Sequence, residues 1–106
     1  MMDAIVVLIT AGSEEEAARI ANSIVEERLA ACVNIVTGIR SIYRWEGRIC
    51  DEKEALLIVK TREELFDALS EKVKNMHSYT VPEIIAIHVV KGFRPYLSWL
   101  NEETSR

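Results

Sequence analysis

The chain has 106 residues, of which 49% are hydrophobic and 28% are charged. This composition is typical of one globular domain, and it excludes a disordered or fibrous chain. The formal net charge of −4, from 13 Lys and Arg against 17 Asp and Glu, argues against nucleic-acid and membrane partners, since both require a basic surface.

The first predicted elements are a strand and a helix. Residues 4–10 (AIVVLIT) form a short apolar run, which predicts a strand covered on both faces. Ser13 is followed three residues later by Glu16, the spacing of a capping box, and this predicts a helix over residues 14 to about 29. Its apolar positions at helical spacing are Ala17, Ile20, Ala21, Ile24 and Val25.

Residues 32–45 alternate with a period of two, which predicts a second strand. It is longer than the roughly 5–6 residues usual for a strand, and Gly38 is a candidate position for a bulge. A strand that extends past its own sheet needs something to pair with, and a neighbouring subunit is one candidate. The residues expected on one face are Val33, Ile35, Thr37, Ile39, Ser41, Tyr43 and Trp45.

The second half of the chain carries two more predicted strands and two more predicted helices. We expect a turn at residues 46–48 and a third strand at 54–61, then a helix from about 62 to 75 that starts with the capping-box pair Thr61 and Glu64. A fourth strand at 83–90 precedes a short helix that begins at Pro95. The order βαββαβ predicts an α+β ferredoxin-like sandwich, a four-stranded antiparallel sheet with both helices on one face, plus the short C-terminal helix.

The sequence also carries signals about the compartment. Two cysteines are too few for a secreted disulfide framework. No apolar run approaches the roughly 20 residues that cross a bilayer, and no signal-peptide pattern opens the chain. We expect a cytoplasmic protein without a membrane partner.

Five segments in order along the chain resemble the CutA divalent-cation tolerance family. They are residues 27–34 (ERLAACVN), 41–49 (SIYRWEGRI), 57–61 (LIVKT), 77–84 (HSYTVPEI) and 96–100 (YLSWL). The resemblance implies one CutA-like domain over residues 1–106 that forms a homotrimer, with sheets meeting edge to edge and the hairpin and C-terminal helix reaching neighbours. It also implies a non-enzymatic role in tolerance to copper and other divalent cations. Animal relatives are associated with acetylcholinesterase anchoring.

Two positions depart from the family pattern. Ser78 and Thr80 stand where Pro and Glu are usual. Loss of proline predicts a less preorganised loop, and loss of the carboxylate weakens any role that needs a charge there. Residues 8–10 read LIT, so the first-strand cysteine that some members carry is absent.

Cys32, His77 and Glu83 are the candidate metal ligands. A thiolate and an imidazole suit copper(II) or zinc, but no CxxC or HxxxH spacing is present, so we expect a weakly held or shared site. The competing interpretations are a buried structural Cys32, an ordinary loop histidine, and Glu83 as only a partner of its neighbours.

Two other functions are open. A PII-like signalling trimer would bind a small anionic ligand between subunits, through residues around the cleft: Lys60, Arg28, Tyr43, Trp45 and Tyr79. The competing interpretation of Lys60 is an ion pair with Glu54 or Glu83. A structural scaffold would instead dock another protein, and the aromatic residues suit such an interface better than single-stranded nucleic acid because no basic stripe accompanies them.

Overall fold

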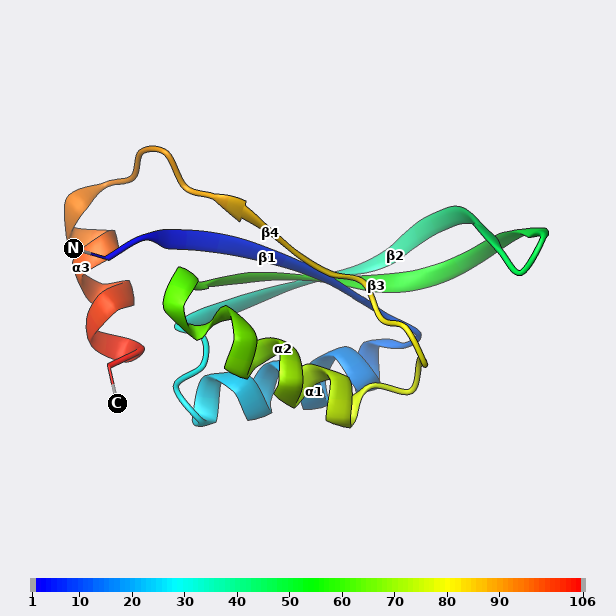
Figure 1. The fold of residues 1–106 in the computed structure, drawn as a ribbon, viewed down its shortest axis with the longest axis horizontal. Coiled ribbons are helices and arrows are strands. Elements are labelled where there is room, and N and C mark those ends of the chain that lie inside the picture. Colours follow the sequence, from blue (N-terminus) through cyan, green and yellow to red (C-terminus); the bar gives the residue numbers. More distant parts are fainter. Residues whose placement is uncertain (1, 106) are drawn as a thin grey trace.

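The computed structural model describes residues 2–105 and contains eight elements. Figure 1 labels the strands and the α-helices. In chain order the elements are β1 (Ala4–Ala11), α1 (Glu14–Glu26), β2 (Cys32–Trp45), β3 (Arg48–Arg62), a 3-10 turn (Glu63–Leu65), α2 (Phe66–Met76), β4 (Ile84–His88) and α3 (Arg94–Glu103). No helix in this part of the chain is both long and apolar enough to cross a membrane.

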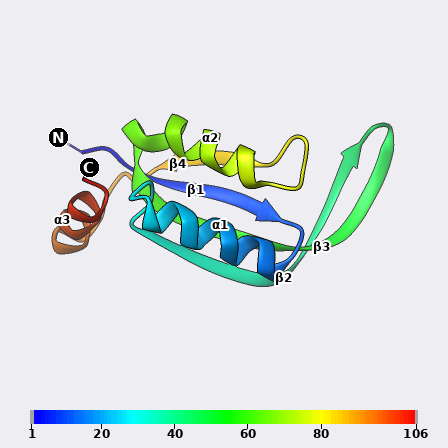
Figure 2. The same ribbon diagram turned by 90° about the horizontal axis from the view of Figure 1, so that it is seen from below.

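The four strands form one sheet in the order β2-β3-β1-β4, and each neighbouring pair is antiparallel. Helices α1 and α2 cover one face of this sheet (Figure 2), which confirms the predicted ferredoxin-like sandwich. The core lies between the layers, where β-branched and leucine side chains from alternate strand positions meet the inner faces of both helices. Fully buried members include Val7, Ile9, Ile20, Ile24, Leu57, Val59, Leu69 and Val73.

Strands β2 and β3 extend past the rest of the sheet as a hairpin arm, defined here as residues 39–54 (Figure 1). The last β1–β3 pair is Ala11 with Ala55, whereas β2 and β3 stay paired out to Trp45 with Arg48. The turn residues Glu46 and Gly47 have φ of 48° and 78°, as a two-residue hairpin turn of type I′ requires. The third strand therefore begins at Arg48, earlier than its sequence pattern predicts.

A bulge at Gly38 separates the arm from the sheet. Gly38 has φ +71°, and the pairing with β3 shifts between Val36 and Ile39. Val36 lies opposite Leu56 and Ile39 lies opposite Glu54, so Val36 and Ile39 share a face despite being three residues apart. The predicted bulge is confirmed, but the prediction that Tyr43 and Trp45 share the face of Val33 and Ile35 is wrong, because the extra residue reverses the alternation.

Helix α1 ends three residues before the predicted position because Arg28 adopts a left-handed conformation (φ 60°). The Arg28 N–H donates to Val25 O (3.0 Å), and the Leu29 N–H donates to Ile24 O (2.9 Å). These two bonds form a Schellman motif, which stops a helix at the left-handed residue.

The second predicted capping box is absent. Thr61 is buried and its hydroxyl donates to Leu29 O (2.7 Å), so it ties β3 to the end of α1. Glu64 instead pairs with Arg62. The spacing was misleading because Thr61 still belongs to β3, and its side chain points into the core.

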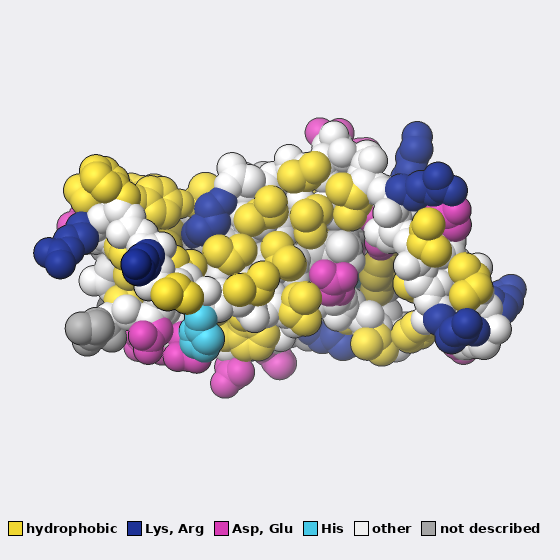
Figure 3. Space-filling model, turned by 90° about the horizontal axis from the view of Figure 1, so that it is seen from above, with side chains coloured by type: hydrophobic (Ala, Val, Ile, Leu, Met, Phe, Trp, Pro, Cys, Tyr) yellow, Lys and Arg dark blue, Asp and Glu magenta, His cyan; other side chains and the backbone are white. Residues whose placement is uncertain are grey.

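Among residues 2–105, no layer covers the middle of the sheet face opposite α1 and α2, and we call this face the open face. Figure 3 shows apolar side chains spread across its middle. The most exposed are Val36 (41%), Ile85 (52%) and Ile87 (56%). Strand alternation also brings half-buried apolar residues to this face from β1 and β3: Val6, Leu8, Leu56 and Ile58.

Candidate functional site

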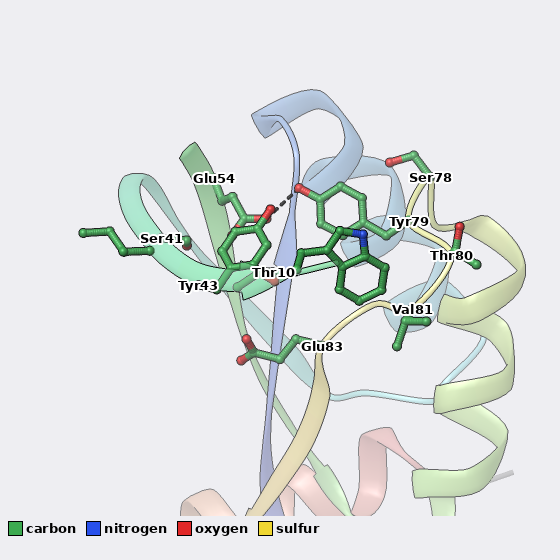
Figure 4. Close-up of a pocket in the computed structure, with 11 residues that line it drawn as sticks. Thr10, Ser41, Tyr43, Glu54, Ser78, Tyr79, Thr80, Val81 and Glu83 are labelled. Atoms are coloured by element: carbon green, nitrogen blue, oxygen red, sulfur yellow. Dashed lines mark hydrogen bonds between the residues drawn. The ribbon is translucent and has the colours of Figure 1, made fainter. Parts of the chain in front are cut away.

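A cavity of about 650 Å³ lies where the hairpin arm leaves the sheet, beside the loop that joins α2 to β4 (Figure 4). Strands β1, β2 and β3 and that loop all contribute to its wall. The lining residues are Thr10, Ser41, Ile42, Tyr43, Trp45, Glu54, Ser78, Tyr79, Thr80, Val81 and Glu83. None of them is Lys or Arg, so the charged groups of the wall are carboxylates.

Glu16 of α1 holds the loop in place. Its carboxylate accepts hydrogen bonds from the Ser78 backbone N–H (2.7 Å) and hydroxyl (3.1 Å), and from the Gly12 N–H (3.2 Å). Burial acts to raise the pKa of Glu16, but these bonds and the nearby His77 outweigh it, so the pKa lies below its ordinary value. The loop is thus fastened to the first helix by an ionised carboxylate.

The first predicted capping box lies in the same region, and only one of its two hydrogen bonds forms. The Ser13 hydroxyl accepts from the Glu16 N–H (3.1 Å), as predicted for an N-cap residue. The Glu16 side chain does not return to the Ser13 N–H but binds Gly12 and the loop. Its role in positioning the loop was not visible in the sequence, where the capping-box spacing was its only signal.

His77 is enclosed at the base of the loop. Its side chain is 0% exposed; Nε2 lies 2.7 Å from Thr10 O, and Nδ1 lies 3.0 Å from the Tyr79 nitrogen. This arrangement fits the tautomer in which Nε2–H donates to Thr10 and Nδ1 accepts from Tyr79. Both ring nitrogens are therefore engaged, and metal ligation by His77 stays a prediction that requires the loop to open.

The next residue of the loop wall, Tyr79, connects the loop to the arm. Its hydroxyl donates to Glu54 (2.6 Å), and Figure 4 shows Tyr43 beside this pair. Burial and the bond to Glu54 raise the pKa of Tyr79, while the bond to Glu52, together with desolvation, raises the pKa of Tyr43. Both phenols therefore stay protonated and act as donors at neutral pH.

Other predicted site residues lie far from the cavity, towards the α3 end of the sheet. Cys32 pairs with Lys60 across β2 and β3, and the Lys60 ammonium donates to Asn34. Leu56, which lies opposite Thr10 at the cavity end, is four residues from Lys60 along β3, about 13 Å at the usual rise of a strand. The structure thus separates Cys32 from His77 and Glu83 within one chain, and no group of three or more His, Cys, Asp or Glu side chains in residues 2–105 is placed to hold a metal ion.

The residues expected to bind an anion are also divided. The Arg28 guanidinium donates to Glu103 O (3.2 Å) at the end of α3, so neither Arg28 nor Lys60 reaches the cavity that Tyr43 and Trp45 line. Glu54, expected only as an ion-pair partner of Lys60, instead forms part of the cavity wall. The sequence predicted the bulge at Gly38 but not its effect on the register, which decides which arm residues face the cavity.

The fold and the cavity define a ferredoxin-like α+β protein with a protruding hairpin and a loop-bounded cavity. Residues 5–103 match the family described as CutA1 divalent ion tolerance protein. The chain belongs to this family, which confirms the resemblance found in the sequence.

Individual relatives support the same assignment. The chain is 58% identical over 99 residues to the divalent-cation tolerance protein CutA of Thermus thermophilus, with 93% of this chain and 96% of that protein covered. It is 53% identical over 100 residues to the chloroplastic CutA 1 of Oryza sativa, with 94% of this chain but 56% of that protein covered.

Solved structures show the same fold. The Thermus thermophilus protein superposes with a TM-score of 0.94 at 56% identity, covering 96% of this chain and 99% of that chain. The Archaeoglobus fulgidus protein, named as periplasmic, gives a TM-score of 0.94 at 46% identity, covering 96% and 99%. The relatives' names differ in compartment, so a cytoplasmic location stays a prediction.

Proposed function

We propose that this chain acts as a homotrimeric, non-enzymatic divalent-cation tolerance protein that binds copper(II) or a similar cation weakly. The observation that carries the proposal is the open face, where apolar side chains from all four strands lie exposed or half-exposed beside a projecting arm. Soluble monomers rarely expose a contiguous apolar surface of this kind. A second and third copy of the chain are the simplest cover for it, because most homo-oligomers close by symmetry.

The hairpin arm supports this assembly. Residues 48–54 of β3 do not pair with β1, and β2 is an edge strand along its whole length. The arm therefore carries unpaired backbone groups and exposed apolar side chains, Ile42 (63%) and Ile49 (63%) among them. Strand edges of this kind commonly pair with another chain.

A metal site must then combine ligands from different subunits. Cys32 is half-buried and Glu83 is exposed, so both can reach a cation without a change of fold, but they lie apart in one chain. A thiolate with carboxylate and imidazole ligands suits copper(II) better than magnesium or calcium. Binding is expected to be weak because no closed set of four ligands preexists.

The proposal is tested by calorimetric titration of copper(II) into the wild-type protein and into Cys32→Ser, Glu83→Gln and His77→Ala variants. We expect saturable binding that Cys32→Ser or Glu83→Gln weakens about tenfold, the loss usual for removal of one contributor to a metal site. The matched control is Glu71→Gln, an exposed carboxylate of α2. Loss of binding in His77→Ala alone, with the fold intact, would show that the loop opens to admit the metal.

Shared ligands make a further demand on the same titration. Ile85→Glu places a charge on the open face and leaves Cys32, His77 and Glu83 unsubstituted, so it should weaken copper binding by breaking the assembly. Val25→Glu alters an equally apolar, exposed position on α1 (40%) and should bind like the wild type. Unchanged copper affinity in a monomeric Ile85→Glu variant would contradict a site shared between subunits.

A further inference from the structure

The wall of the cavity at the base of the arm has an unusual chemical composition. Its charged side chains are Glu54 and Glu83, and its large side chains include three aromatic rings, those of Tyr43, Trp45 and Tyr79. Such a wall disfavours an anion, since it offers no positive charge. It also differs from a cation site made of oxygen ligands alone, because much of its surface is apolar.

Glu54 is the more informative of the two carboxylates. The residue is only 7% exposed, and one of its carboxylate oxygens accepts a hydrogen bond from the Tyr79 hydroxyl. Among residues 2–105 neither Glu54 nor Glu83 has an ion-pair partner. Buried carboxylates are normally paired with a positive charge. Glu54 has no such partner within residues 2–105, and the cavity beside it is where a cation could pair with it.

Glu54 keeps this position because three elements fix it. It is the arm residue of β3 that adjoins Ala55, where the pairing with β1 begins, and it pairs with Ile39 directly after the bulge. Tyr79 reaches it from the loop, and Figure 4 shows the two side chains joined across the cavity. The loop in turn is held by Glu16 through Ser78, so the carboxylate and the aromatic walls are positioned before a ligand arrives.

We propose that this cavity binds a small organic ammonium ion, with its charged head beside Glu54 and its alkyl groups against Tyr43, Trp45 and Tyr79. Aromatic faces attract cations, and an ammonium ion with an apolar envelope matches a wall of rings and carboxylates. The volume of about 650 Å³ lies within the range of about 300–1,000 Å³ typical of small-molecule sites, and is far larger than one metal ion needs. Glu83 lies near the exposed rim and adds to the negative potential. This ligand class goes beyond the proposed metal function and uses residues of one chain.

The test uses tetramethylammonium chloride and propylammonium chloride as probes, with sodium chloride at equal ionic strength as the blank. Trp45 fluorescence reports binding in a Trp99→Phe background, since the chain has only 2 tryptophans. Calorimetry of the unaltered protein supplies an independent affinity. Both probes are expected to bind saturably, and acetate is not.

Two variants separate the charge from the rings. Glu54→Gln should weaken both probes about thirtyfold, because it removes the enclosed partner charge. Trp45→Leu, read by calorimetry, should weaken the quaternary probe about threefold to tenfold and the primary amine less, since a quaternary ion has no N–H to donate to a carboxylate. Glu46→Gln, an exposed carboxylate at the tip of the arm, is the matched control and should leave both affinities unchanged.

If Glu54→Gln does not fold, Glu83→Gln replaces it, with a smaller weakening expected because Glu83 is exposed. The proposal would be overturned if neither probe binds saturably. It would also be overturned if the Glu54 or Glu83 variant binds the probes with the same affinity as the Glu46→Gln control. Because copper(II) is titrated separately, failure of the ammonium site leaves the metal result standing, and the reverse also holds.

Discussion

At the scale of single residues, Ser78 shows how a departure from the family pattern is compensated. The family resemblance led us to expect proline there and hence a looser loop in this chain. Instead Ser78 donates two hydrogen bonds to Glu16, one from its backbone N–H and one from its hydroxyl. Proline has no N–H and no hydroxyl, so this fastening is available only to a residue such as serine.

Glu16→Gln should therefore destabilise the protein by about 2 kcal/mol, within the range for hydrogen bonds to a charged group. In the wild type both oxygens of the Glu16 carboxylate accept hydrogen bonds. The amide of glutamine replaces one of these oxygens with an NH₂ group, which cannot accept, so the Ser78 and Gly12 N–H groups lose part of their pairing. Denaturant unfolding at neutral pH measures the loss. Glu15→Gln changes an exposed carboxylate in the same helical turn, and an equal loss there would contradict the assigned role.

The same pair of proteins should show a defined pH dependence. The pKa of Glu16 is lowered by folding, so its stabilisation is fully present above the unfolded value of about 4.3 and is lost as pH falls through the lower, folded value. The difference in unfolding free energy between wild type and Glu16→Gln should shrink as the solution is acidified through this window. A difference that stays constant from pH 7 to pH 2 would contradict this.

At the scale of elements, the long strands are where prediction and structure agree least. The hydrophobic pattern was sufficient for the order βαββαβ, since apolar periods of 3.6 and 2 mark helices and strands. It could not place the start of β3, because four of the six residues at 48–53 are charged, and their strand conformation comes from pairing with β2. It also could not reveal which side of the arm faces the cavity, since one extra residue at the bulge inverts that assignment.

The bulge at Gly38 in β2 can be tested by substitution. The Gly38 φ of +71° is left-handed, and an added Cβ would meet no atom within 4 Å, so the penalty for alanine is purely conformational. Gly38→Ala should lower the free energy of unfolding by about 1 kcal/mol. Gly38→Asn should lose less, because asparagine tolerates this conformation. Thermal unfolding of the three proteins checks the order, and equal midpoints for alanine and glycine would show that the bulge is not maintained.

At the scale of the whole molecule, shape and surface both support the proposed assembly. The radius of gyration is 14.2 Å and the longest extent is 44 Å, whereas a compact chain of 100 residues has a radius of gyration of about 13 Å. The arm accounts for this elongation (Figure 1). A small domain buries a limited share of its apolar surface by itself, so covering the open face adds to its stability.

Sedimentation velocity tests the assembly directly. The wild-type protein is expected to sediment as three chains, and Ile85→Glu as one, because a buried, unpaired carboxylate opposes association. Val25→Glu, on the helical side of the molecule, should remain with the wild type. A wild-type protein that stays monomeric at micromolar concentration would remove the basis for a homotrimer.

The candidate site also depends on the whole molecule, because its residues come from three strands and a loop. Residue types, chain position and the family resemblance identified His77, Tyr43, Trp45, Tyr79 and Glu83 as candidates. The structure places the last four around one cavity, and His77 contacts the wall residues Thr10 and Tyr79. These sequence features could not reveal that Cys32, Lys60 and Arg28 lie towards the other end of the sheet, because that separation depends on the β2–β3 register. They also could not show how deeply His77 is enclosed, since its neighbours come from β1 and the following loop.

The hairpin arm has a consequence for how proteins built like this one can diverge. Between Ile39 and Glu54 the two strands pair only with each other, so the length of this ribbon is independent of the packing beneath the helices. Insertion of two residues in each strand would lengthen the reach by about 7 Å and keep every core residue in register. Insertion of a single residue on one side would turn the tip over. In the proposed homotrimer, the distance between subunits would thus change in steps of paired residues, while the hydrophobic core retains its sequence.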